Sequence, residues 1–151
     1  GHDIQVTKEG FETVEFLFDF HSRSQVLYVR MVSAEYLEHE AEEAIKEFDY
    51  PGARDYLDRA LAINEKNASA RYLLAILHFR TRDFENAEAQ LLQLKEDGYE
   101  DIYVRLLLAD VYEHGMDRPA AALEELRTVY RETRLEELRE RIDELENAGV
   151  N

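Results

Sequence analysis

The chain has 151 residues, and its 34 acidic and 18 basic side chains give a formal net charge of −16 at pH 7. A field of that sign repels phosphate backbones and anionic membrane surfaces, so we expect no nucleic-acid partner. The sequence contains no cysteine, which excludes disulfides, thiolate zinc sites and cysteine nucleophiles. The length is that of one domain, large enough to bury a core without such cross-links.

No stretch of the sequence is apolar over the length that a membrane-spanning helix needs. The longest uncharged stretch with helical character runs only from Tyr72 to Phe79. No signal peptide is recognisable either. We therefore expect no membrane insertion, and we favour a cytoplasmic location.

The N-terminal segment, residues 3–33, is unusually apolar. Four of the seven phenylalanines fall within ten positions, at Phe11, Phe16, Phe18 and Phe20. An exposed patch of this size would associate with another surface. We therefore expect the segment to pack on the rest of the chain or on a second copy, and these four phenylalanines are candidate self-association residues.

The pattern of residues 11–32 fits two kinds of secondary structure. A helix would gather the polar residues into one stripe, whereas a strand would alternate apolar and polar residues from Val14 to Phe20, interrupted only by Leu17. We favour the helix, because helical neighbours are what the end of a helical array can pack against. A hairpin that turns through residues 21–24 is the alternative. If a helix continued from there into the next element, Ser33 would lie in mid-helix.

From Ser33 onward, residue types recur at intervals of 34 residues. An internal period of this length is typical of stacked helix pairs. The recurrent residues are helix-capping types and small alanines. The columns are Ser33, Asn67 and Asp101; Asp49, Asp83 and Asp117; Ala41, Ala75 and Ala109; and Ala53, Ala87 and either Ala121 or Ala122, with one extra residue inserted around positions 118–120.

Packing explains the recurrent alanines, since two antiparallel helices approach closely only where the facing side chains are small. Larger apolar residues surround them at spacings of three and four, which is the helical period. In the middle unit these are Leu74, Leu77, Phe84, Leu91 and Leu94. The sequence therefore predicts an array of helical hairpins.

This pattern resembles the tetratricopeptide repeat family, with three repeats at about 34–67, 68–101 and 102–136. The resemblance implies an all-α fold, a right-handed alpha-alpha superhelix, here with an N-terminal apolar extension and a C-terminal capping helix. Two departures from the family pattern stand out. The aromatic usual at position four is Leu37, Arg71 and Arg105, and the proline usual between repeats is Glu65, Tyr99 and Arg134.

The last helix is predicted to begin at Thr133, where Thr133 and Glu136 would form a capping box. Its apolar stripe is narrow and the rest of its surface is charged, as the end of a helical array requires. The stripe consists of Leu135, Leu138, Ile142 and Leu145. Residues 137–151 would complete this capping helix and a short tail.

The resemblance also implies that the first helix of each repeat lines a concave groove. The family's usual contact positions fall on aromatic, aliphatic and acidic residues in this sequence. The candidate groove residues are Glu38 and Glu42 in the first repeat, Tyr72, Ile76, Phe79 and Arg80 in the second, and Tyr103, Leu106, Asp110 and His114 in the third. The subset of the family that grips a terminal carboxylate uses lysine and asparagine, and Glu38 and Glu42 argue against that use by charge.

These residues predict a non-catalytic interaction module that binds a protein or peptide partner, apolar in one part and basic in another. The alternative is a self-assembling scaffold in which the N-terminal segment joins two copies as a homodimer. In a third arrangement this segment would fold back into its own groove. No catalytic motif is present, and His39 with its neighbouring glutamates lacks further converging ligands. We therefore expect no enzyme activity, no cofactor and no metal.

Overall fold

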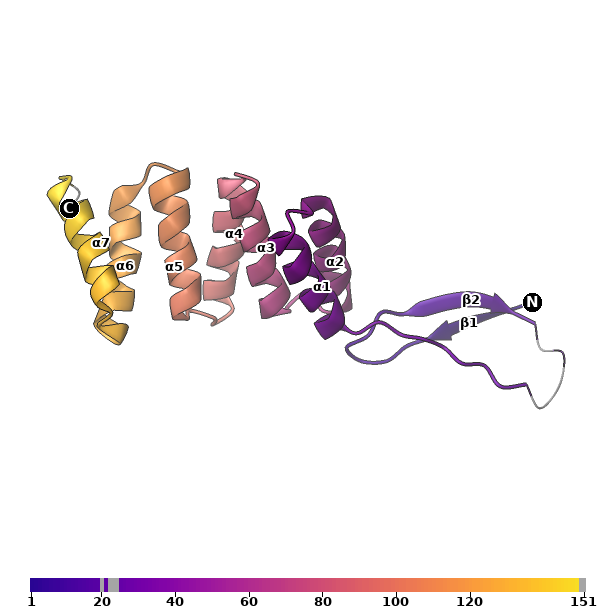
Figure 1. Cartoon of the computed structure of the whole chain (residues 1–151). Helices are drawn as coiled ribbons and strands as arrows, with labels where there is room; N and C mark the ends of the chain where they lie inside the picture. The colour runs from indigo at the N-terminus through magenta and orange to yellow at the C-terminus, as the bar shows by residue number, and fades with distance from the viewer. Residues whose placement is uncertain (20, 22–24, 150–151) are drawn as a thin grey trace. The chain divides into compact units, whose positions relative to one another are not determined.

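A computed structural model describes residues 1–19, 21 and 25–149. The described residues group into two compact units, one ending at Ala70 and the other beginning at Arg71. The described residues form two strands and seven α-helices, which are labelled in Figure 1, and one π-helical turn. They are β1 (His2–Val6), β2 (Val14–Phe18), α1 (Ala34–Lys46), α2 (Tyr50–Ile63), α3 (Ala68–Arg80), α4 (Phe84–Glu96), α5 (Ile102–Asp110), η1 (Val111–Gly115), α6 (Pro119–Thr133) and α7 (Glu136–Asn147).

The first helix pair, α1 and α2, begins at the two caps that the sequence predicts. Ser33 Oγ accepts a hydrogen bond from the Tyr36 amide at 3.1 Å, and Asp49 Oδ1 accepts one from the Gly52 amide at 3.0 Å. Each bond satisfies one of the free amides at a helix start. Ser33 is therefore a cap, and the alternative of an unbroken helix through Ser33 is wrong.

The recurrent alanines are buried throughout, as predicted. Their exposed fraction is zero in every column: Ala41, Ala53, Ala75, Ala87, Ala109 and Ala122. Ala122, and not Ala121, is thus the third member of its column. The caps Asn67, Asp83 and Asp101 also accept amide hydrogen bonds, from Ala70, Asn86 and Val104 respectively. The helical part of the chain is therefore an all-α solenoid, and its helices cross where the sequence carries small residues.

The third repeat differs from the prediction where its first helix ends. The π-helical turn η1 follows α5 directly, and the Met116 amide bonds to the Val111 carbonyl, five residues back, at 3.0 Å. A π turn holds one residue more than an α turn. The inserted residue is therefore absorbed in η1 and not around positions 118–120. As a result α6 begins one position late, Arg118 stands at its N-cap, and Asp117 is not the cap that we predicted.

Gly115, at the end of η1, lies against the aromatic ring of Phe84. A Cβ added at Gly115 would come within 2.3 Å of that ring, far inside any normal contact. A residue with a side chain would have to push Phe84 aside. The π turn and the glycine thus allow the backbone of η1 to approach α4 closely.

The N-terminal segment forms a hairpin, so our preferred helix for residues 11–32 is wrong. Strands β1 and β2 pair antiparallel, with Ile4 opposite Phe16 and Val6 opposite Val14. Apolar and polar residues alternate from Asp3 to Val6 and from Val14 to Phe16, which is the strand period, and Leu17 interrupts the alternation in β2. The turn covers residues 7–13 and contains Gly10 at φ 79°. The strand alternative was correct for residues 14–18, but residues 25–32 belong to no strand.

The base of the hairpin is tied to the first helix pair. Glu12 accepts two hydrogen bonds from Arg59 of α2, at 2.6 and 2.9 Å. The Ala34 amide donates to the Gly10 carbonyl at 2.9 Å, and the Glu12 amide donates to the Val32 carbonyl at 2.8 Å. From this base the two strands extend away from α1 and α2 (Figure 1).

The C-terminal helix α7 starts later than predicted. Thr133 is the last residue of α6, and Arg134 takes the left-handed conformation, φ 57°, that ends it. The start of α7 at Leu135 has no side-chain cap, so the predicted capping box is wrong. Thr133 instead donates its hydroxyl to the Val129 carbonyl, within its own helix. Leu138 and Ile142 of α7 are buried, as the predicted stripe requires. In the described part of the chain, no helix has the length and hydrophobicity needed to cross a bilayer.

Candidate functional site

Most of the predicted groove residues belong to the second unit. Burial raises the pKa of the Tyr72 phenol, and the charges of Asp101 and Asp110, together with Tyr103, raise it further. Tyr72 of α3 therefore shares its surroundings with Tyr103 and Asp110 of α5. Tyr72 is half-buried, whereas Tyr103 is 63% exposed. One half-buried phenol and one phenol open to solvent thus lie on the first helices of successive repeats.

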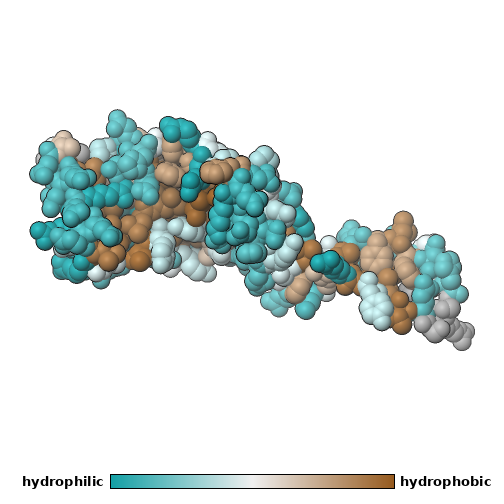
Figure 2. Space-filling model, in the orientation of Figure 1, coloured by the Kyte–Doolittle hydropathy of each residue, from teal (hydrophilic) through white to brown (hydrophobic). Residues whose placement is uncertain are grey.

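The other predicted residues of α3 and α5 are partly exposed. Ile76, Phe79 and Leu106 are neither buried nor fully open, and Arg80 is exposed. Phe79 is held by an edge contact with Phe84, with ring centroids 5.7 Å apart. Figure 2 shows apolar surface across the region that α4, α5 and α6 occupy in Figure 1, among polar side chains.

The acidic end of this set is paired within the chain, which the sequence did not indicate to us. Arg141 of α7 donates to Asp110 Oδ1 at 2.7 Å and to Glu113 Oε2 at 3.0 Å. Burial lowers the pKa of Arg141, but the hydrogen bond to Glu113 and the charge of Asp110 outweigh it, so the pKa stands above its usual value. His114, beside them, is exposed.

Arg141 could have been found from one signal in the sequence. It is a basic residue directly before Ile142, next to the apolar stripe of a helix that is otherwise mostly acidic. An arginine beside an apolar stripe reaches across the helix interface with its head group. α7 is also joined to α6 by an ion pair, Arg127 to Glu146, at 2.8 Å.

The predicted residues of the first repeat lie in the other unit. Glu42 is exposed and forms an ion pair with Lys46 at 3.1 Å, one turn further along α1. Glu38 is partly exposed on the same helix. Both residues belong to the first unit and are described with it alone.

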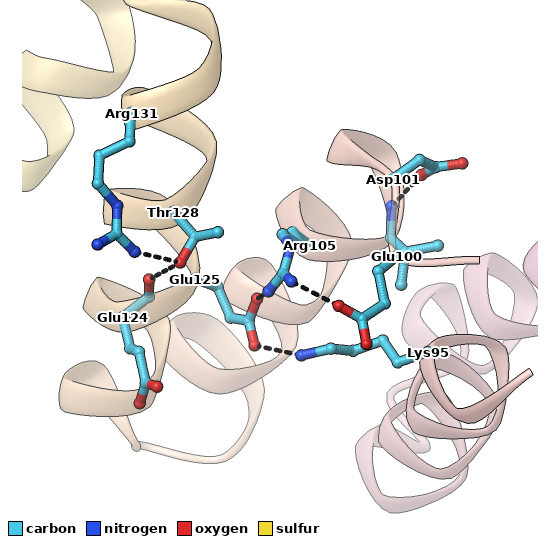
Figure 3. A network of polar contacts seen from close by, with 9 residues as sticks. Lys95, Glu100, Asp101, Arg105, Glu124, Glu125, Thr128 and Arg131 are labelled. Carbon is cyan, nitrogen blue, oxygen red and sulfur yellow. Dashed lines mark hydrogen bonds and ion pairs between the residues drawn. The ribbon is translucent and has the colours of Figure 1, made fainter. Parts of the chain in front are cut away.

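A second charged cluster, in the second unit, is structural in character (Figure 3). Glu125 of α6 is almost fully buried and accepts hydrogen bonds from Lys95 at 3.0 Å and from Arg105 at 2.8 Å. Arg105 also bonds Glu100 at 2.8 Å. The two cations link α4, α5 and α6 through this one carboxylate. They also pair its charge, which would be strongly destabilising if it were buried alone.

This cluster accounts for one departure from the family pattern. Arg105 stands where an aromatic is usual, and it bonds Glu125 on the second helix of its repeat. In the preceding repeat Arg71 does the same with Gln90, at 2.9 Å. In both repeats, therefore, a hydrogen bond between the two helices replaces the contact that the usual aromatic residue would make.

The N-terminal phenylalanines are only partly covered. Phe11, Phe16 and Phe18 are each half-exposed, and Phe16 and Phe18 meet edge to face with centroids 6.4 Å apart. Lys8 lies over the Phe11 ring, 4.3 Å from its centre. Phe20 lies outside the described residues. Among the described residues, no group of three or more histidines or carboxylates is arranged to hold a metal ion.

Residues 44–111 match the tetratricopeptide repeat family. No protein with curated annotation matches the chain significantly in sequence. Among solved structures, the tetratricopeptide repeat domain of OM64 from Arabidopsis is 16% identical, with a TM-score of 0.68 over 76% of this chain and 95% of that one.

The N-terminal domain of stress-induced protein-1 from C. elegans is 18% identical. It gives a TM-score of 0.61 over 75% of this chain and 94% of that one. Identities this low establish a shared fold and say nothing about a shared ligand. The family match over residues 44–111, the buried alanine columns and the shared fold together support the assignment of the helical part of this chain to the tetratricopeptide repeat family.

Proposed function

We propose that this chain is a non-catalytic protein-protein interaction module that binds a peptide or a helical segment along the first helices of its repeats. The observation that carries the proposal is the set of partly exposed aromatic and aliphatic residues on α3 and α5, centred on Tyr72 and Tyr103. Tyrosine is well suited to such contacts, because it offers a large apolar area with a hydrogen-bonding end and has few rotatable bonds.

The chemistry of the ligand follows from the neighbouring charges. Ile76, Phe79 and Leu106 offer apolar contacts, while the exposed His114 and the pair of Asp110 and Glu113 lie at the other end. Arg141 already neutralises part of that acidic end. A basic side chain of the ligand would have to share these carboxylates with Arg141. Most of the affinity should therefore come from the aromatic residues.

A selection from a displayed library of random peptides, followed by mutation, tests the proposal. Replacing Tyr72, Phe79 and Tyr103 together with alanine should weaken binding of a selected peptide by about 100-fold or more, since each residue of this kind is worth about 1–2 kcal/mol in an interface. Isothermal titration calorimetry measures the change. Unchanged affinity would remove the proposal.

Tyr99 provides a matched control, because it is an exposed tyrosine of the same unit that lies outside the first helices. Tyr99→Ala should leave the affinity of the same peptide unchanged. A loss equal to that of the triple variant would mean that the peptide binds elsewhere on the chain.

Self-assembly through the N-terminal segment is the second candidate function. It is favoured by the incomplete burial of Phe11, Phe16 and Phe18 in the hairpin. Light scattering of the full chain and of a chain starting at Ser33 compares the two. Only the full chain should exceed the mass of a monomer, and a monomeric mass for both would remove this candidate.

A further inference from the structure

At the base of the hairpin, Phe11 and Ser33 begin a strand pairing that does not extend into the described residues 25–32. Phe11 stands opposite Ser33 in an isolated antiparallel bridge. Opposite residues in an antiparallel pair have a constant sum of residue numbers, so this bridge fixes a register. Continued along β2, the register would place Tyr28 opposite Phe16, Leu27 opposite Leu17 and Val26 opposite Phe18.

Four of these six side chains, those of Leu17, Val26, Leu27 and Tyr28, are exposed in the structure. Within the described residues the sheet has two strands, β1 and β2, so β2 keeps one edge without a strand partner. Leu17 is 73% exposed, Val26 69% and Tyr28 90%. An unpaired edge flanked by apolar side chains is a ready site for strand addition.

The sequence of residues 25–31 complements this edge. In the register of the bridge, apolar residues face apolar residues at three consecutive positions, and aromatic pairs of this kind stabilise a sheet. No like charges meet, because Arg30 would face Val14 and Val29 would face Glu15. The strand that fits the edge best is therefore carried by the chain itself.

From these observations we propose that residues 25–31 of one copy pair with β2 of a second copy, so that two chains exchange strands at their N-termini. The proposal rests on the second candidate function, self-assembly, and specifies how it occurs. The exchange is reciprocal and closes with two-fold symmetry. It pairs both open edges and stacks the half-exposed faces that carry Phe16 and Phe18.

The distribution of charge favours a second copy as the occupant. Residues 1–33 contain five acidic and three basic side chains, a net −2, whereas the whole chain carries −16. Two copies therefore meet with the least repulsion at this end. A strand pairing within one chain would fill the edge but leave the apolar face of the hairpin uncovered.

The size of the interface sets the expected affinity. Residues 25–31 and the five residues of β2 make about a dozen residues from each copy, fewer than the 20–30 of a standard interface. The dimer should therefore form reversibly with concentration. Multi-angle light scattering from low micromolar to millimolar chain should show the mass rising from 17.7 kDa toward twice that value.

Lysine substitutions at the edge test the pairing. The double variant Leu17→Lys, Tyr28→Lys should weaken dimerisation at least about tenfold, since lysine on an open edge opposes strand addition. Both side chains are exposed, so the folded monomer should persist, and circular dichroism verifies this. Phe48→Lys is the control, because Phe48 is equally exposed but lies after α1, away from the strands.

Engineered cysteines distinguish exchange between copies from pairing within one chain. The natural sequence has no cysteine, so Leu17→Cys and Leu27→Cys can be made as separate variants, one of them isotopically labelled. Mixed and oxidised, they should give a 17–27 bridge between labelled and unlabelled chains. Leu17→Cys mixed with Ser33→Cys, which the register does not bring together, should give far less.

Each outcome decides a separate point. A full chain that stays monomeric at all concentrations removes both self-assembly and the strand exchange. A dimer that survives the two lysines, or the absence of a 17–27 bridge between labelled and unlabelled chains, overturns the exchange. Self-assembly would then have to use another surface. Peptide binding on α3 and α5 is unaffected by any of these results.

Discussion

In the helical unit that begins at Arg71, large apolar side chains such as Leu91 and Leu108 are wholly buried, whereas Leu17 and Tyr28 near the N-terminus face solvent. The two regions have similar supplies of apolar residues and use them differently. A helix pair buries its apolar side against its neighbours, but a two-stranded hairpin has no second layer to cover its face. The hairpin therefore leaves apolar side chains exposed where the repeats bury theirs.

The same difference appears in the ion pairs. Glu125 lies almost fully buried between Lys95 and Arg105 and ties three helices together. Glu12, which ties the hairpin to Arg59, is more exposed. Water screens the second pair more than the first, so the two should contribute unequally to folding.

The largest expected effect comes from the same substitution made in both regions. Leu91→Ala should lower the free energy of unfolding by about 2–5 kcal/mol, because it leaves a cavity in a closed core. Leu17→Ala should change it by about 0.5 kcal/mol or less in dilute monomer. Urea denaturation followed by circular dichroism measures both. Equal losses would contradict the contrast between the regions.

A smaller effect is expected from the buried carboxylate. Glu125→Gln should cost about 2–3 kcal/mol, because it removes a buried charge that two partly buried cations share. Glu124→Gln, one residue earlier and exposed, should cost almost nothing. Thermal unfolding of the two variants compares them, and a harmless Glu125→Gln would mean that the cluster contributes little to the repeats.

Gly115→Ala tests how tightly the repeats pack. The added methyl group would press on Phe84, so we expect a loss of about 1–2 kcal/mol. Combining it with Phe84→Leu, which frees space, should recover part of the loss in a double-mutant cycle. Additive losses would show that the glycine is needed for its backbone alone.

The smallest effect should come from the anchor of the hairpin. The hydrogen bond from Arg59 holds the pKa of Glu12 below its usual value. A lowered folded-state pKa stabilises the fold above the unfolded pKa, and this stability is lost as pH falls through the folded pKa. Glu12→Gln should cost about 0.5–1 kcal/mol at pH 7 and nothing at pH 2. A cost that persists in acid would exclude the ion pair as its source.

The repeat architecture could be predicted from the sequence because one physical requirement recurs in it. Each helix crossing needs a small residue, so Ala41, Ala75 and Ala109 revealed the period and were found buried. The hairpin lacked such repetition. Residues 14–18 alternate as a strand does except at Leu17, and this interruption left the helix as our preferred prediction. In the structure Leu17 lies in the strand and is exposed.

The candidate site was less accessible to sequence reasoning. The positions on α3 and α5 followed from the family register, and the charge of Asp110 contributes to the raised pKa of Tyr72. The pairing of Asp110 and Glu113 with Arg141 did not follow, because it joins residues about thirty positions apart across two helices. Local periodicity carries no information about which charged side chains meet at that separation.

The π turn at Val111–Gly115 has a practical consequence for anyone who edits this chain. The third repeat is one residue longer than its neighbours, and the surplus residue is stored in this turn while the caps and alanines on either side keep their roles. A swap of whole repeats, or an alignment to a regular 34-residue template, should therefore place its single gap between Val111 and Met116. A template without this gap would put Ala121, and not Ala122, at the helix crossing and would shift the side chains of α6 by about 100° around the helix axis.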